Sequence, residues 1–202
     1  MSITLYGNPL SGHVHRVEMF LAMLGLPYHV ERTMASDTKT PEFLAINPYG
    51  QIPALRDGDR IVCDSNAIIV YLALRYDAGG PWYPQDPLIA AEVQRWLSFA
   101  AAEVRFGLAV ARAIKLFGNP SDLAAAHKLG NRFLVFMDGH LAGRDFLAHS
   151  HATLADIACY SYVARSPEGG YDLTSFVHIQ AWLRRIEALP RFLPMPETSP
   201  PV

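Results

Sequence analysis

The sequence changes its pattern of apolar residues near residue 77. Before that point, short apolar runs typical of strands alternate with segments whose apolar residues recur at helical spacing. After it, helical spacing continues almost to the end of the chain. Alternating strands and helices build a sheet covered by helices, whereas successive helices build a bundle. Because residues 78–87 are rich in glycine and proline, the sequence predicts an α/β domain over 1–77, a linker over 78–87 and an all-helical domain over 88–202.

The α/β part is predicted to contain four strands and three helices in the order β-α-β-α-β-β-α. The strands are 3–6, 28–31, 53–56 and 61–64, and the helices are 12–25, 41–46 and 65–76. The first two strands must be parallel because a helix connects them. Asp57-Gly58 between the last two strands indicates a hairpin, and Ser65 is expected to cap the third helix.

The helical part is predicted to form four helices near 88–117, 121–142, 153–164 and 175–188. Thr153 and Asp156 have the spacing of a capping box, in which a hydroxyl and a carboxylate satisfy the first amides of a helix. From Pro194 onward the repeated prolines cannot continue a helix, so a loose tail is expected there.

Charge and composition exclude several classes of function. The protein has 17 basic and 19 acidic residues, a formal net charge of −2, and no clustered basic excess that would indicate a nucleic-acid partner. The most apolar stretches, 68–74 and 100–111, are too short or too charged to span a membrane, and the N-terminus lacks the pattern of a secretory signal. The two cysteines, Cys63 and Cys159, are far apart in the sequence, so no disulfide framework is expected and the cytoplasm is the expected location.

Histidine pairs occur twice, as His13 with His15 and as His149 with His151. Side chains at i and i+2 of a helix point apart, so the first pair is a poor metal site and no metal is expected. His13 is near Ser11 in sequence, where it either faces solvent or lines a pocket.

The start of the first helix carries the first candidate for chemistry. The element order is thioredoxin-like in outline, and redox members of that fold place C-x-x-C where this helix begins. Here the same place reads Pro9-Leu10-Ser11-Gly12-His13, which excludes dithiol exchange. A hydroxyl at a helix N-terminus is suited to hold a bound thiolate, because it donates a hydrogen bond and the helix dipole favours an anion. The alternative for Ser11 is a simple helix N-cap.

Two further segments are suited to a peptide-like ligand. Gln51-Ile52-Pro53 puts a proline at the start of the third strand, where a cis bond would leave the preceding backbone free to pair with a ligand as an added strand. Asp64-Ser65 could hold an amino-acid head group, with the carboxylate binding an ammonium and the helix N-terminus binding a carboxylate. The alternatives are a proline that merely begins a strand and two ordinary capping residues.

A resemblance to a known family rests on an ordered set of motifs. In the first domain these are Ser11 with Arg16-Val17, Lys39-Thr40-Pro41-Glu42-Phe43, Asn47-Pro48-Tyr49-Gly50-Gln51-Ile52-Pro53-Ala54-Leu55 and Asp64-Ser65-Asn66-Ala67-Ile68. In the second they are Thr153-Leu154-Ala155-Asp156-Ile157-Ala158 and the stretch from Ala181-Trp182-Leu183 to Pro190. With these motifs the sequence resembles the soluble glutathione transferases, specifically the serine-type and related bacterial forms, over nearly its whole length.

The resemblance implies roles for the residues that would bind the middle and the glycyl end of glutathione. Ser11 would stabilise the glutathione thiolate. Ile52 would pair its backbone with the cysteinyl unit, ahead of a cis Pro53. Lys39 would neutralise the glycyl carboxylate. Many family members have histidine where this chain has Thr38, which departs from the family pattern at this end of the ligand.

The resemblance also implies how the γ-glutamyl end would bind. Asp64 and Ser65 would hold it, with Gln51 close by. Family members often have glutamate at the position of Asp64, whose side chain is one methylene shorter. Tyr49 occupies the position where some classes place an aromatic residue in the dimer interface, so the resemblance implies a homodimer.

The expected activity is attack of an enzyme-bound glutathione thiolate on a small electrophile or a peroxide, with glutathione as co-substrate and no metal. A scaffold protein that keeps the fold without turnover, and a glutathione-dependent isomerase, dehalogenase or peroxidase, remain alternatives. No short motif identifies the electrophile, which is expected to bind to helix faces of the second domain. Arg105 and Arg112 are candidates for polar contacts with it.

Overall fold

The computed structural model describes residues 2–196 and 198. The chain divides into two compact units. The first contains the residues up to Gly80 together with Pro190–Pro196, and the second contains Pro81–Leu189.

A four-stranded mixed sheet forms the centre of the first unit. Its strands are β1 (Ile3–Gly7), β2 (Tyr28–Arg32), β3 (Ala54–Asp57) and β4 (Arg60–Cys63), in the spatial order β2-β1-β3-β4. β1 is parallel to β2 and antiparallel to β3, and β3 forms the predicted hairpin with β4. The parallel pair follows from the helical connection between β1 and β2.

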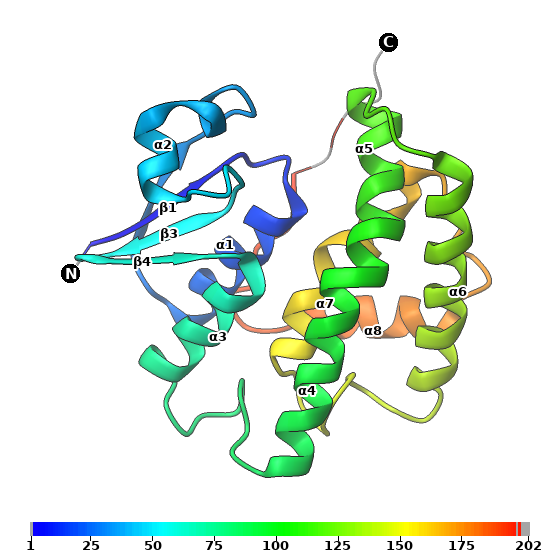
Figure 1. Ribbon diagram of the computed structural model, residues 1–202. Helices are drawn as coiled ribbons and strands as arrows, with labels where there is room; N and C mark the ends of the chain where they lie inside the picture. The colour runs from blue at the N-terminus through cyan, green and yellow to red at the C-terminus, as the bar shows by residue number, and fades with distance from the viewer. Residues whose placement is uncertain (1, 197, 199–202) are drawn as a thin grey trace. The chain divides into compact units, whose positions relative to one another are not determined.

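Three helices cover this sheet. They are α1 (Gly12–Leu24), α2 (Pro41–Ile46) and α3 (Ser65–Tyr76), and a short 3₁₀ turn, Asp37–Lys39, precedes α2. Figure 1 shows α1 and α3 on one face of the sheet and α2 on the other. Apolar residues that α1, α3 and the sheet bury between them include Leu5, Val17, Phe20, Leu55, Ile68 and Leu72. The predicted thioredoxin-like arrangement is confirmed.

The second unit is helical, as predicted. Its helices are α4 (Pro87–Phe99), α5 (Val110–Phe117), α6 (Leu123–Leu141), α7 (Leu154–Ala164) and α8 (Val177–Glu187), with a 3₁₀ turn at Ser166–Gly169. The single helix predicted over 88–117 is continuous in Figure 1, but its middle, Ala100–Ala109, is π-helical and separates α4 from α5. Every residue of α7 from Leu154 to Val163 is buried, because a helix that is apolar on all sides needs neighbours all around it.

The segment that precedes the C-terminus differs from the sequence-based expectation. A loose tail was predicted from Pro194, yet Pro190–Pro196 belongs to the first unit and Met195 is only 3% exposed. The buried His15 of α1 lies 2.8 Å, through Nε2, from the carbonyl oxygen of Leu193. Proline prevents a helix but not an extended segment that buries an apolar side chain. Positions 197 and 199–202 of the predicted tail lie outside the described residues.

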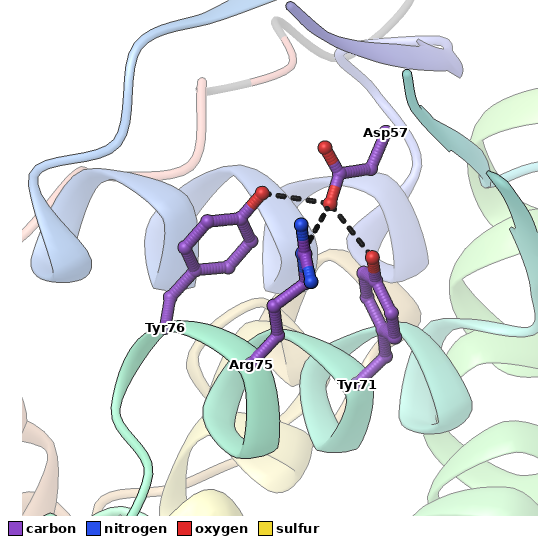
Figure 2. A network of polar contacts seen from close by, with 4 residues as sticks. All are labelled: Asp57, Tyr71, Arg75 and Tyr76. Carbon is purple, nitrogen blue, oxygen red and sulfur yellow. Dashed lines mark hydrogen bonds and ion pairs between the residues drawn. The ribbon is translucent and has the colours of Figure 1, made fainter. Parts of the chain in front are cut away.

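A buried carboxylate joins the far end of α3 to the β3–β4 hairpin. Figure 2 shows the three side chains that converge on Asp57, which is 1% exposed. Its Oδ2 accepts hydrogen bonds from Tyr71 Oη at 2.7 Å, Tyr76 Oη at 2.7 Å and Arg75 Nε at 3.0 Å. Burial alone raises the pKa of the Asp57 carboxyl, but the tyrosine hydrogen bonds and the Arg75 cation outweigh it and hold the pKa below its ordinary value of 3.8.

This cluster predicts a loss of stability in acid. Because the folded-state pKa of Asp57 is depressed, its contribution is complete above the unfolded value near ~4 and is lost as the pH falls through the lower folded value. Asp57→Asn should lower the free energy of unfolding by about 2 kcal/mol at neutral pH and reduce the slope of stability against pH below ~4. Urea unfolding at several pH values measures both effects. Asp59→Asn, at an exposed position of the same turn, is the control and should leave the curve unchanged.

Candidate functional site

The sheet register brings the three candidate segments to one end of the sheet. Tyr6, near the end of β1, pairs with Ala54 at the start of β3, and Ala54 pairs with Cys63 at the end of β4. The chain that leaves β1 leads to α1, the chain that enters β3 contains residues 51–53, and the chain that leaves β4 leads to α3. All three therefore meet at the same end of the sheet, and two of them are helix N-termini.

Ser11 is the N-cap of α1, with extended backbone angles φ −83° and ψ 119°. Its Oγ accepts a hydrogen bond from Val14 N at 3.4 Å, which is long for this bond type. The first turn of α1 contains no acidic residue, so nothing there opposes an anion. Capping uses a lone pair of the hydroxyl and leaves its proton to be donated, so the two roles considered for Ser11 are compatible.

The segment before β3 is held in a fixed shape by an asparagine. Asn47 Nδ2 donates to the carbonyl oxygen of Gln51 at 2.7 Å, and Asn47 Oδ1 accepts from Tyr49 N at 3.1 Å. The Ile52–Pro53 peptide bond is cis, as the family resemblance implied. Within the described part of the chain, no hydrogen bond engages the backbone N–H or C=O of Ile52. Its backbone thus has the donor and acceptor that an added strand requires.

The N-terminus of α3 corrects one prediction. Asp64, not Ser65, is the N-cap: its Oδ1 accepts from Asn66 N at 2.9 Å and from Ala67 N at 3.0 Å. The Asp64 backbone has φ 73°, a left-handed value that is uncommon for a residue other than glycine. Ser65 is already helical, as the first residue of α3, and is 4% exposed.

Lys39 is exposed at the end of the 3₁₀ turn, close to the segment before β3. A Cβ atom on Gly50, which has φ 64°, would lie 3.2 Å from Lys39 Nζ. The lysine therefore lies over the backbone just ahead of Gln51. Thr38 is buried, and its Oγ1 donates to the carbonyl oxygen of Ala35 at 2.9 Å.

Sequence reasoning gave no role to Arg16, which the structure brings to the site. Arg16 is 1% exposed, and its Nη1 lies 2.7 Å from both Ser65 Oγ and Asn66 Oδ1. His13 Nδ1 lies 3.4 Å from the same Ser65 oxygen, so His13 faces α3. The available signal was the position of Arg16 itself, between Val14 and Val17, two apolar positions of the predicted helix.

The two arginines considered for the second substrate differ in their surroundings. Arg112 is buried, and its Nε lies 2.5 Å from Glu168 Oε2, so its charge is already paired within the second unit. Arg105 is partly exposed, with its guanidinium 5.5 Å from the centre of the Phe106 ring.

Models of known protein families match most of the chain and identify its family. The model of the glutathione S-transferase N-terminal domain matches residues 5–82, and that of the C-terminal domain matches residues 101–190. The chain belongs to the glutathione S-transferase family. The predicted family and the prediction of a transferase enzyme are therefore confirmed.

Individual relatives agree with this assignment. Glutathione S-transferase 3 of Zea mays is 35% identical over 94% of this chain and 91% of its own length. The crystal structure of a glutathione S-transferase from Pseudomonas fluorescens has a TM-score of 0.91 and 34% identity, covering 96% of this chain and 99% of that one. A glutathione transferase homologue from Drosophila mojavensis, solved with bound glutathione, has a TM-score of 0.84 and 27% identity over 94% of this chain and 89% of its own.

In residues 2–196 and 198, no group of three or more histidine, cysteine, aspartate or glutamate side chains could hold a metal ion. Among the same residues, no helix is long and apolar enough to cross a membrane.

Proposed function

We propose that this enzyme is a serine-type glutathione transferase that binds glutathione in its first unit and ionises the thiol at Ser11. The observation that carries the proposal is the convergence of two helix N-termini and the unpaired Ile52 backbone at one end of the sheet. The glutathione bound to the Drosophila mojavensis homologue supports the choice of ligand. The thiolate then attacks an electrophilic carbon, forming a C–S bond while a leaving group departs with its electron pair or a conjugated acceptor takes up the pair; with a peroxide it attacks an oxygen and the O–O bond breaks, releasing an alcohol after protonation.

Activation of the thiol requires a modest amount of selective stabilisation. Lowering a thiol pKa from ~8.5 by about 2 units takes roughly 2.7 kcal/mol. One hydrogen bond from Ser11 to a charged sulfur, at about 1.5–3 kcal/mol, and a helix-dipole contribution of ~0.3–1 kcal/mol supply that amount.

The remaining groups of glutathione find complementary partners in the same unit. The backbone of Ile52, ahead of the cis Pro53, pairs with the cysteinyl amide as an added strand. Asp64 is exposed and keeps the acceptor capacity of Oδ2 for the γ-glutamyl ammonium while Oδ1 caps α3. Ser65 and the N-terminus of α3 take the γ-glutamyl carboxylate, with Gln51 beside them.

Lys39 is assigned to the glycyl carboxylate, which predicts a salt-dependent loss of affinity on its removal. Because the lysine is exposed, Lys39→Gln should weaken glutathione binding only by about 2- to 5-fold at low salt, and less at high salt. Titration calorimetry measures the change. Lys128→Gln, at an exposed position of α6, is the matched control. Glutathione amidated at its glycyl carboxylate should bind both variants and the native protein equally. If Lys39→Gln weakens binding of this analogue as much as it weakens binding of glutathione, the assignment of Lys39 to the glycyl carboxylate is rejected.

The second substrate is assigned to the helical unit. A panel of aryl halides, isothiocyanates, hydroperoxides and maleyl-type acids tests the reaction class most economically. Retention on glutathione resin without turnover of any panel member would favour a scaffold protein. We also propose a cytoplasmic homodimer, supported by Tyr49, which is 79% exposed on the loop before Gly50; sedimentation equilibrium tests the dimer.

A further inference from the structure

A buried arginine lies directly behind the proposed γ-glutamyl site. Arg16 is on α1, and its Nη1 donates at 2.7 Å to Ser65 Oγ and at 2.7 Å to Asn66 Oδ1, both in the first turn of α3. With 1% of its surface exposed, Arg16 has no room to touch a ligand itself. The hydrogen bonds of Arg16 therefore affect glutathione only through the residues that accept them, Ser65 and Asn66.

The bond to Arg16 limits what the Ser65 hydroxyl can do. A guanidinium has no acceptor and stays protonated at every working pH, so it is always the donor in this pair. Ser65 Oγ therefore gives one lone pair to Arg16. His13 Nδ1 lies 3.4 Å from the same oxygen, a long contact that a ligand carboxylate can replace as the acceptor of the hydroxyl hydrogen. Hydrogen bonds in series polarise one another, so the hydroxyl becomes a stronger donor.

The charges around Ser65 determine which charge a ligand group beside it should have. The buried Arg16 cation and the positive end of α3 both favour an anion in front of Ser65. The Asp64 carboxylate, one residue earlier and exposed, favours a cation. An α-amino acid head group has one of each, so this arrangement admits it in one orientation only.

We propose that Arg16 is a positioning residue that fixes the Ser65 hydroxyl as a donor to the γ-glutamyl carboxylate of glutathione. This inference rests on the proposed function, but it concerns affinity and recognition of the head group rather than activation of the thiol. Arg16 therefore affects the dissociation constant and the KM for glutathione, and it leaves the pKa of the bound thiol and kcat at saturating glutathione nearly unchanged.

The test uses the full chain and three ligands. They are glutathione, an analogue that lacks the γ-glutamyl amine (glutaryl-Cys-Gly) and an analogue that lacks the γ-glutamyl carboxylate (4-aminobutanoyl-Cys-Gly). Arg16→Met should lower the affinity for glutathione and for the glutaryl analogue by about tenfold, because the hydrogen bond from Ser65 to their charged carboxylate is weakened. The affinity for the aminobutanoyl analogue should stay within about twofold of the native value. In a Ser65→Ala background the same substitution should have almost no further effect.

Two variants keep the inference testable if Arg16→Met does not fold. Arg16→Lys retains the charge but loses the rigid guanidinium, so it should show the same selective loss at a smaller size. Asn66→Ala removes the second acceptor and should not change the discrimination among the ligands. Equal weakening of all three ligands by Arg16→Lys, or an undiminished effect without Ser65, would show a general structural role. Failure of the native protein to bind glutathione would instead overturn the proposed function.

Discussion

Replacing Asp156 with alanine is expected to lower the free energy of unfolding by about 3–5 kcal/mol, the largest effect on stability that we predict. Asp156 is completely buried at the start of α7. Its Oδ1 accepts from Leu147 N at 3.0 Å and Trp182 Nε1 at 2.8 Å, and its Oδ2 accepts from Thr153 N at 2.9 Å. Alanine leaves these buried donors without an acceptor and opens a cavity at the start of α7.

Urea unfolding of the two proteins measures this loss, and Asp122→Ala is its control. Asp122 also satisfies amides at the start of a helix, as the N-cap of α6 through bonds from Ala124 N and Ala125 N, but it is exposed. Its replacement should lower the free energy of unfolding by only about 1 kcal/mol. Equal effects of the two substitutions would mean that the buried network adds nothing to ordinary capping.

Replacing Ser11 with alanine is expected to have the largest effect on activity. If native Ser11 holds the bound thiol near pKa ~6.5 and its loss returns the thiol toward ~8.5, the ionised fraction at pH ~6.5 falls from about one half to about one hundredth. The rate at that pH should therefore fall roughly 50-fold. The two rates should converge as the pH rises above ~9, because both thiols are then ionised.

The pH profile of kcat/KM separates this role from helix capping. Loss of a cap costs about 1 kcal/mol of stability at every pH and does not shift the profile. Ser11→Thr keeps both a capping oxygen and a hydroxyl proton and should retain most of the activity near neutrality. A profile of Ser11→Ala that is lowered uniformly, without a shift to higher pH, would contradict thiolate stabilisation.

Local periodicity and turn chemistry predicted most of the fold. The βαβ connection required β1 and β2 to be parallel, Asp57-Gly58 predicted the hairpin, and Thr153 with Asp156 predicted the capping box. The π-helical segment, Ala100–Ala109, was not predicted because it retains a helical apolar pattern. It packs against α6 where a Cβ on Gly107 would lie 2.8 Å from the Gly130 backbone.

The residues of the site were predictable from the sequence, but the side-chain contacts between them were not. Asp64 and Ser65 can each cap a helix, and the choice depends on the Asp64 backbone, which the sequence does not reveal. The links from Arg16 to Ser65 and from His15 to Leu193 join positions 49 and 178 residues apart. Neither link has a local signal, because tertiary packing alone brings these residues together.

In the proposed mechanism Ser11 stabilises the thiolate of glutathione bound in the first unit. The most direct test of this role follows the ultraviolet absorbance of the thiolate as the complex with glutathione is titrated with base. The native protein should ionise the bound thiol about 2 units below the free value of ~8.5, and Ser11→Ala should ionise it near the free value. Identical titrations of the two proteins, with glutathione bound to both, would contradict the role of Ser11.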